Sequence, residues 1–252
     1  MISIKSPSEI DLMRKAGEIA KNALILGGKL VNPGITTGEI DLEIEKYIRS
    51  HNAVPSFKGY NGFPASACIS INEEVIHGIP GKRVIREGDI VSIDVGACFE
   101  GYHGDCAATF AVGTVAEEVK ALIETTRQCF YEGIKFARVG YRISDISSAI
   151  QKYAEERGFS VVRPYVGHGV GASLHESPEV PNFGRPGHGP RLVQGMTIAV
   201  EPMINLGVCD VRVLYDKWTV VTADGKPSAH YENTILITDG DPEILTSGSE
   251  IL

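Results

Sequence analysis

The sequence predicts a mixed α/β fold built from two pseudo-symmetric halves. Two observations favour this class. Helix-start signals precede apolar runs typical of strands, and this order of elements occurs twice along the chain. In addition, matching strands of the two copies each carry an acidic residue beside the apolar run. The 252 residues are enough for one large domain or two small ones.

The composition is typical of a soluble globular protein, with 43% apolar and 22% charged residues. A net charge of −8 disfavours a generally basic surface for nucleic acids or membranes. No run approaches the roughly 20 apolar residues of a membrane span, and the first residues do not resemble a signal peptide. Five cysteines without a Cys-x-x-Cys motif suit reduced thiols, so we expect a cytoplasmic protein.

Two capping boxes open the first half. The segment Ser6-Pro7-Ser8-Glu9 predicts a long helix with proline at its first position. The segment Thr36-Thr37-Gly38-Glu39 predicts a second helix that stops near His51. Apolar residues at helical spacing are expected to face the core: Ile10, Met13, Gly17, Ala20 and Leu24 in the first helix, and Ile40, Ile44, Tyr47 and Ile48 in the second.

A strand at residues 66–72 and a hairpin are expected next. Asp94 lies in a strongly apolar run, and Asp105 follows the predicted turn Phe99-Glu100-Gly101. The turn would place the two carboxylates opposite or diagonal to each other, where they repel unless a cation lies between them. The alternative for this pair is an edge strand with Asp94 turned to water.

The second half repeats this plan from Ala116 onward. Residues 34–40 align with residues 140–146 at an offset of 106, and both segments precede a helix. Residues 87–94 align with residues 194–201 at an offset of 107, which places one acidic residue on another. Chance similarity between helix-loop-helix-strand units is the alternative. A true repeat predicts that the acids of the two halves meet in the middle of the fold.

The repeat and its neighbours supply a set of hard metal ligands. Glu201 ends one strand and Glu232 begins a later one, which gives four carboxylates with Asp94 and Asp105. His168 lies between glycines and could add an imidazole. Such ligands suit Mn²⁺, Fe²⁺, Co²⁺ or a Zn²⁺ pair, and bridging carboxylates can hold two ions about 3.5–4 Å apart around a shared water.

A site of this kind could hydrolyse the first peptide bond of a chain. The ions would convert the water to hydroxide, polarise the carbonyl and fix the free amine, while Glu201 would accept the proton. His77 is a candidate proton donor, and a hydrogen-bonded turn histidine is the alternative. His175-Glu176 is not a His-Glu-x-x-His motif, and neither a Gly-x-Ser-x-Gly elbow nor a phosphate-binding loop occurs. The remaining histidines are interpreted as structural or surface residues: His51, His103, His188 and His230.

The ordered motifs together resemble the type I methionine aminopeptidases from about Ile4 to Leu245. The resemblance implies one catalytic domain over 1–252, with halves at about 5–113 and 114–252. It implies the pita-bread fold, in which an antiparallel-rich sheet flanked by helices surrounds a dinuclear metal site. The motifs that carry it are Asn72–Pro80, Ser92–Gly96, Gly101–Asp105, Gly167–Gly171, Val200–Pro202 and Tyr231–Thr234.

The resemblance also implies a role for each ligand. Asp94 would bind one divalent ion, Asp105 and Glu232 would bridge both, and His168 and Glu201 would hold the other. The ions would be Co²⁺, Mn²⁺, Fe²⁺, Zn²⁺ or Ni²⁺. The implied activity is removal of the initiator methionine from nascent proteins with a small second residue. A metal-bridged hydroxide would attack the scissile carbonyl, with Glu201 as the general base.

Substrate contacts follow from the same resemblance. His175 would lie near the scissile carbonyl and His77 toward the second residue, and both are assigned catalytic roles. The methionine pocket would be formed by Tyr60, Phe63, Cys68 and Trp218. Three residues depart from the pattern of some members, and all three concern recognition rather than metal ligation: Phe57, Asn61 and Leu174.

The expected partner is the N-terminal methionine of nascent polypeptides. The enzyme is expected to act as a monomer with at most transient ribosome contact, and without nucleic-acid specificity or membrane association. Three other readings stay open. An aminopeptidase P or prolidase shares the five ligands but usually carries a separate N-terminal domain. A partner-binding protein of this fold would lack ligands, and a protein stabilised by structural metals would leave no open coordination position.

Overall fold

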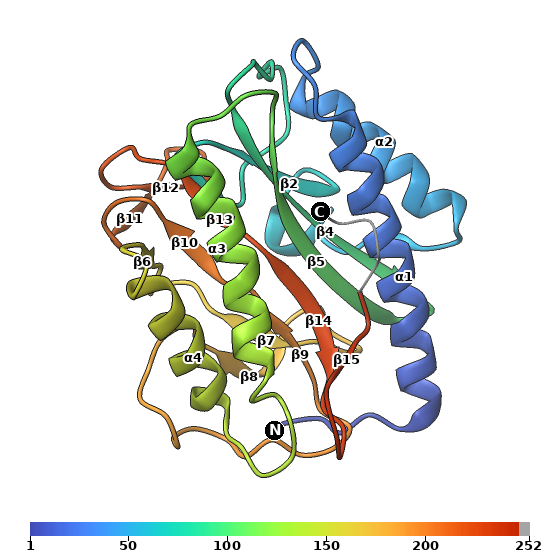
Figure 1. Cartoon of the computed structure of the whole chain (residues 1–252). Helices are drawn as coiled ribbons and strands as arrows, with labels where there is room; N and C mark the ends of the chain where they lie inside the picture. The colour runs from blue at the N-terminus through green and yellow to red at the C-terminus, as the bar shows by residue number, and fades with distance from the viewer. Residues whose placement is uncertain (247–252) are drawn as a thin grey trace.

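A computed structural model describes residues 1–246, and it confirms the predicted mixed α/β class. Within this range four α-helices lie against antiparallel sheets (Figure 1). A short 3₁₀ helix, η1, spans Tyr60–Gly62. The helices are α1 (Pro7–Leu30), α2 (Thr37–Ser50), α3 (Glu117–Ile134) and α4 (Ile143–Glu155).

The main sheet has nine strands and joins the two halves of the chain. Its order is β1-β4-β5-β14-β9-β7-β8, with β2 also paired to β4 and β15 to β14. The strands are β1 (Val54–Pro55), β2 (Ala67–Ile71), β4 (Ile90–Phe99), β5 (Tyr102–Ala111), β7 (Gly167–Gly169), β8 (Glu176–Val180), β9 (Thr197–Val200), β14 (Glu232–Leu236) and β15 (Glu243–Ile244).

Two smaller sheets lie beside the main one. The first has the order β13-β10-β6 and the second has the order β11-β12-β3. Their strands are β3 (Glu74–Ile76), β6 (Ser160–Val161), β10 (Met203–Asn205), β11 (Val211–Val213), β12 (Val220–Thr222) and β13 (Ser228–His230).

The predicted helix starts are confirmed. Ser6 and Glu9 form a complete capping box at α1, and Thr36 and Glu39 form a second one at α2. Each box satisfies backbone N–H groups that have no partner within the helix. The inward faces agree with the apolar spacing, since Met13, Gly17, Ala20 and Leu24 of α1 and Ile40, Ile44 and Ile48 of α2 are buried.

The hairpin β4–β5 places Asp94 and Asp105 diagonally across two strands. Asp94 lies opposite Ala107, and Asp105 lies opposite Gly96. The turn residues Glu100 and Gly101 both have positive φ, 47° and 84°, as a two-residue hairpin loop requires. The edge-strand alternative for Asp94 is wrong, because β4 pairs with β5 and also with β1 and β2.

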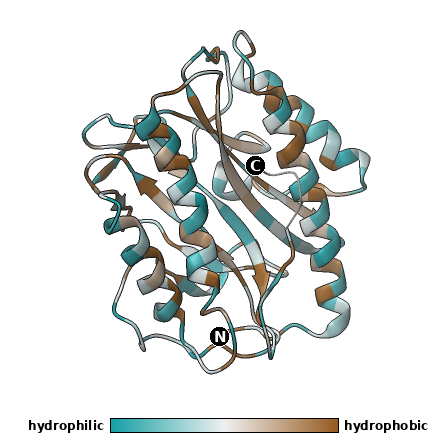
Figure 2. Cartoon of the chain, in the orientation of Figure 1, coloured by the Kyte–Doolittle hydropathy of each residue, from teal (hydrophilic) through white to brown (hydrophobic). Residues whose placement is uncertain are grey.

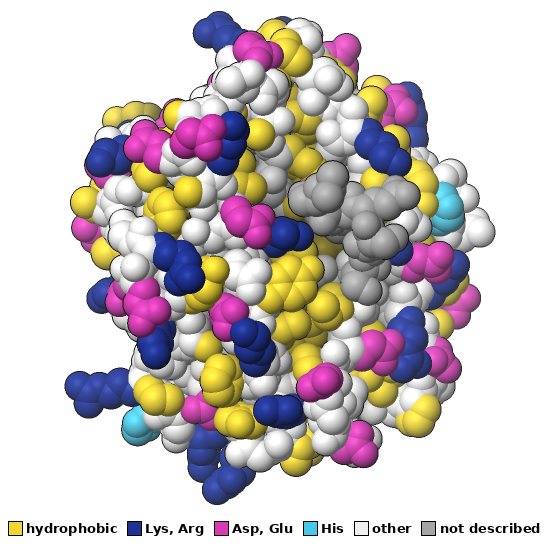
Figure 3. Space-filling view, in the orientation of Figure 1, with side chains coloured by type: hydrophobic (Ala, Val, Ile, Leu, Met, Phe, Trp, Pro, Cys, Tyr) yellow, Lys and Arg dark blue, Asp and Glu magenta, His cyan; other side chains and the backbone are white. Residues whose placement is uncertain are grey.

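Hydrophilic residues lie within the central strands of this otherwise apolar sheet (Figure 2). On the face in Figure 3, basic and acidic side chains alternate over the surface, in line with the modest net charge of −8. Among residues 1–246, no helix is both long and apolar enough to cross a membrane. The five cysteines are all free thiols, which agrees with the absence of a disulfide frame.

Helix α1 packs on β5 through two facing glycines. A Cβ added to Gly104 would lie 2.5 Å from the backbone N of Gly17 and 2.6 Å from its Cα. Neither backbone can yield easily, since α1 is held along its length by buried apolar residues. This close approach fixes β5 one residue before Asp105.

Gly104→Ala is therefore expected to lower the free energy of unfolding by about 3 kcal/mol, at the upper end of overpacking effects. Urea denaturation of the purified proteins measures the change. Gly81→Ala is the matched control, because its added methyl group would meet no atom within 4 Å. Equal unfolding midpoints for the two variants would show that α1 and β5 do not constrain each other here.

Candidate metal centre

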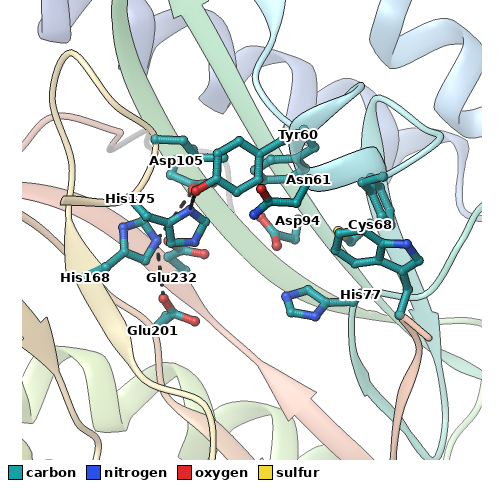
Figure 4. Close-up of a pocket in the computed structure, with 14 residues that line it drawn as sticks. Tyr60, Asn61, Cys68, His77, Asp94, Asp105, His168, His175, Glu201 and Glu232 are labelled. Atoms are coloured by element: carbon teal, nitrogen blue, oxygen red, sulfur yellow. Dashed lines mark hydrogen bonds and ion pairs between the residues drawn. The ribbon is translucent and has the colours of Figure 1, made fainter. Parts of the chain in front are cut away.

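One pocket gathers all the residues singled out in the sequence (Figure 4). Its volume is about 320 Å³, and acidic and imidazole groups lie beside an apolar wall. The lining residues are Phe57, Tyr60, Asn61, Phe63, Cys68, His77, Asp94, Asp105, His168, Leu174, His175, Glu201, Trp218 and Glu232.

Five consecutive strands bring the candidate ligands together. In the order β4-β5-β14-β9-β7, each strand or its end contributes one residue, namely Asp94, Asp105, Glu232, Glu201 and His168. Strand alternation sets the direction of these side chains. The neighbours of Asp105 on β5 face α1, because Gly104 meets Gly17 and Cys106 belongs to the main core. The Asp105 carboxylate therefore points to the opposite face of the sheet.

The ligand atoms lie close enough to share cations. His168 Nε2 lies 3.6 Å from Glu201 Oε1 and 3.9 Å from Asp105 Oδ2. The site contains two groups of three residues, and within each group the potential ligand atoms lie within 4.8 Å of one another. One group is Asp105, His168 and Glu232, and the other is Asp94, His230 and Glu232, so Glu232 belongs to both. A shared carboxylate between two groups is the arrangement that a pair of ions requires.

The polar atoms of the pocket fit bound cations. Within residues 1–246, three buried oxygens of this cluster have no hydrogen-bond partner: Asp94 Oδ1, Asp105 Oδ1 and Glu232 Oε1. Burial raises the pKa of Asp105 to about 7. Burial also raises the pKa values of Asp94, Glu201 and Glu232, and neighbouring carboxylates raise them further. Divalent cations would satisfy both the oxygens and the charge.

These raised pKa values predict an unusual pH dependence for the metal-free protein. Folded carboxyls that bind protons more strongly than unfolded ones stabilise the protein at low pH, and the stability is lost as pH rises through the folded pKa. Burial lowers the pKa values of five histidines, which are therefore largely neutral in both states above about pH 7.5: His77, His103, His168, His175 and His230.

We therefore expect the metal-free protein to lose stability from pH 7.5 to pH 8.5, by about 1.4 kcal/mol per pH unit for each carboxyl still protonated when folded. Bound Mn²⁺ should abolish or reverse this slope, because the cation replaces the protons. Thermal melts at several pH values, with a chelator or with excess Mn²⁺, measure both slopes. A metal-free protein that gains stability over this range would contradict the burial of charge in the pocket.

His168 is held in the tautomer that a metal ligand needs. Its Nδ1 lies 2.8 Å from the carbonyl oxygen of Gly169, which can only accept a hydrogen bond. Nδ1 therefore carries the proton and Nε2 presents its lone pair to the carboxylate cluster. Burial lowers the pKa of His168 to about 3, so the ring is neutral at physiological pH.

His175 and His77 lie at the opening of the cluster. His175 Nδ1 is 2.9 Å from the Tyr60 hydroxyl, and its ring centroid lies 4.0 Å from that of His168. A buried ion pair anchors the next residue, with Lys5 Nζ 2.6 Å from Glu176 Oε2. His77 has a φ of 59°, and burial lowers its pKa to about 4. Neutral imidazoles at these positions can donate hydrogen bonds to a bound carbonyl.

The apolar wall closes the other end of the pocket. Phe63 and Trp218 pack edge to face with ring centroids 5.1 Å apart. Phe57, Cys68 and Leu174 belong to the same small core cluster as Phe63. Asn61 lies on η1 at the exposed side of the pocket, with a φ of 50°. The departures at residues 57 and 174 therefore line the apolar wall, and Asn61 lies at the rim.

The sequence interpretation makes His230 a structural or surface residue, and the structure excludes the surface position. His230 is only 2% exposed, and its Nε2 lies 3.7 Å from Glu232 Oε2 and 3.9 Å from Glu201 Oε2. The signal that could have found it is the spacing of two from Glu232, which places both side chains on one face of an extended chain. His230 also belongs to the second group of potential ligands, with Asp94 and Glu232.

Comparison with known proteins agrees with this site. The model of metallopeptidase family M24 matches residues 11–239. The chain therefore belongs to metallopeptidase family M24. The predicted enzyme class, a metal-dependent peptide hydrolase that uses divalent ions, is confirmed.

The similarity to individual proteins is more specific. The chain is 57% identical over 246 residues to the methionine aminopeptidase of Clostridium perfringens, covering 98% of this chain and 99% of that protein. The crystal structure of the methionine aminopeptidase from Thermotoga maritima matches with a TM-score of 0.97 at 47% identity, covering 98% of this chain and all of that one. These relatives confirm the resemblance to methionine aminopeptidases and the pita-bread fold.

A prolidase from Pyrococcus furiosus shares the fold alone. It matches with a TM-score of 0.80 at 24% identity, and the match covers 98% of this chain but 66% of the prolidase. The aminopeptidase P or prolidase reading of the sequence therefore has weaker support than the methionine aminopeptidase reading.

Proposed function

We propose that the protein removes the N-terminal methionine from new proteins and peptides whose second residue is small. The observation that carries this proposal is a single pocket in which an apolar wall adjoins four carboxylates and an imidazole. Methionine aminopeptidases of 57% and 47% identity over nearly the whole chain support the same activity.

Five residues would hold two divalent ions, which supply Lewis acidity and an activated water when bound. Asp94 would bind one ion, Asp105 and Glu232 would bridge both, and His168 and Glu201 would hold the other. The shared membership of Glu232 in both ligand groups supports its bridging role, and the free Nε2 of His168 supports its role as a ligand.

The protons of the reaction would be moved by residues of the chain. Glu201 would accept a proton as the general base, because its carboxylate lies in the cluster that would hold the ions and their activated water. His175 donates a hydrogen bond toward the scissile carbonyl, with its ring held by Tyr60. His77, beside Trp218, contacts the second residue of the substrate.

The methionine side chain would occupy the apolar end. Phe63, Cys68 and Trp218 offer aromatic and sulfur groups to a thioether, and Tyr60 lines the same pocket. A cavity of about 320 Å³ has room for one long side chain and the peptide bond after it. The preference for a small second residue is part of the proposal, and the peptide panel below tests it.

The whole chain is proposed to act as one catalytic domain, with related halves at 5–113 and 114–252. The main sheet supports this arrangement, because β5 of one half pairs with β14 of the other. We also propose a monomer that acts in the cytoplasm, where nascent chains carry the initiator methionine, and that contacts the ribosome only transiently.

A peptide panel tests the proposed function. After chelation, the protein is given one metal at a time and assayed on Met-Ala-Ser, Met-Lys-Ser, Leu-Ala-Ser and Ala-Pro-Ala. We expect no activity without metal and a kcat/KM on Met-Ala-Ser about 10–200-fold above that on the others, since a misfitting group typically costs 1–3 kcal/mol. Equal turnover of Met-Lys-Ser would contradict the second-residue preference. Preferred turnover of Ala-Pro-Ala would favour the aminopeptidase P or prolidase reading.

A further inference from the structure

His230 is a buried imidazole inside the site to which no role has been assigned. We propose that His230 is a positioning residue, whose Nε2–H holds one oxygen each of Glu201 and Glu232 and so orients both carboxylates toward the ions. The proposal rests on the proposed metal site and adds a residue to it.

The backbone of His230 is fixed from two sides. The Thr109 hydroxyl on β5 accepts a hydrogen bond from the His230 N–H at 2.9 Å and donates one to the His230 carbonyl, also at 2.9 Å. On the other side, His230 pairs in register with Met203 of β10. A residue whose backbone is fixed by hydrogen bonds on both sides can orient neighbouring side chains such as Glu201 and Glu232.

Within the described part of the chain, the His230 side chain lacks a hydrogen-bond partner at one ring nitrogen. Its Nε2 is buried and has no hydrogen-bond partner within residues 1–246. Leaving a buried polar group unsatisfied destabilises the fold. The oxygens of Glu232 at 3.7 Å and Glu201 at 3.9 Å are within reach, about half an ångström beyond a hydrogen bond.

In each of the two carboxylates, one oxygen faces His230 and the other is available to a cation. Glu201 Oε2 faces His230, whereas Glu201 Oε1 faces His168, 3.6 Å from its Nε2. Glu232 Oε2 faces His230, whereas the buried Glu232 Oε1 has no hydrogen-bond partner. A donor at this point therefore selects which oxygens meet the ions. It also reduces the repulsion between the two carboxylates.

Outer partners of this kind commonly change metal affinity or activity by 10–100-fold when they are removed. We expect His230→Leu to remain folded, to lower kcat on Met-Ala-Ser by about 10–100-fold with little change in KM, and to weaken Co²⁺ binding by a similar factor. His230→Gln restores an N–H donor and should recover both quantities to within roughly threefold, with a wild-type Co²⁺ absorption spectrum. The exposed His188→Leu is the control for loss of a histidine.

Calorimetric Co²⁺ titration, the visible spectrum of bound Co²⁺ and circular dichroism give readouts that do not depend on turnover. His230→Leu with wild-type Co²⁺ affinity and kcat would overturn the proposal. Equal impairment of the folded His230→Leu and His230→Gln variants would also overturn it. Loss of one bound Co²⁺ in both variants would overturn it as well, because it would show that His230 is itself a metal ligand. A wild-type protein that binds no Co²⁺ would instead defeat the proposed function itself.

Discussion

Glu201→Gln is expected to leave a folded protein with kcat on Met-Ala-Ser lowered by about 10³-fold. Glutamine keeps the volume of the side chain and one oxygen, but its amide cannot accept the proton that a general base takes. General-base catalysis typically contributes 10²–10⁴-fold. Glu201 is only 9% exposed, so a group outside the pocket cannot readily replace it.

Steady-state kinetics after reconstitution with Mn²⁺ measure this loss, and a Mn²⁺ titration of the same sample separates loss of the base from loss of an ion. Glu179→Gln is the matched control. Glu179 lies opposite His168 in the sheet but is exposed, so its activity should equal that of the wild type. Full activity in Glu201→Gln would remove Glu201 from the base role.

Asp105→Asn is expected to abolish binding of the metal pair and to lower kcat/KM by about 10⁴-fold or more. The reason is that the bound ions stabilise the transition state by several kcal/mol. Asp105 is 3% exposed and lies at the centre of the cluster, within 3.9 Å of His168. The amide keeps the shape and removes the charge. It also removes a source of repulsion from Asp94 and Glu232.

The same substitution should therefore raise the melting temperature of the metal-free protein at pH 8 while it removes metal binding. Isothermal titration with Mn²⁺ and thermal melts with a chelator measure the two effects. Glu100→Gln, at the exposed turn of the same hairpin, should change neither quantity. A variant that keeps two bound ions, or one that melts lower than the metal-free wild type, would contradict the bridging position of Asp105.

Local signals were sufficient for the helices and for the hairpin of the first half. The capping boxes at Ser6 and Thr36 begin α1 and α2, because they satisfy backbone groups that only a helix leaves free. The turn at Glu100 likewise fixes the register that sets Asp94 diagonal to Asp105. These features depend on residues close in sequence, so the sequence alone predicts them.

The pairing of distant strands could not be predicted in the same way. Trp218 and His77 come together because β12 pairs with β3, which joins Val220 to Ile76 across more than half of the chain. Neither short strand has a periodicity that selects its partner. The family resemblance assigned both residues to the pocket, whereas physical reasoning from their spacing did not.

His230 marks the limit of sequence reasoning most clearly. An imidazole beside Tyr231 has no local feature that distinguishes a surface histidine from a buried one. Its burial comes from the pairing of β13 with β10 and from Thr109 on β5, which are all non-local contacts. The alternation with Glu232 indicated a shared face, but only the sheet shows that this face is the site.

The most direct test of the central claim is an anomalous-scattering map of crystals grown with Mn²⁺. We expect two peaks about 3.5–4 Å apart, surrounded by Asp94, Asp105, His168, Glu201 and Glu232. Peaks elsewhere on the molecule, or an empty pocket at saturating Mn²⁺, would contradict the claim that these five side chains hold a pair of divalent ions.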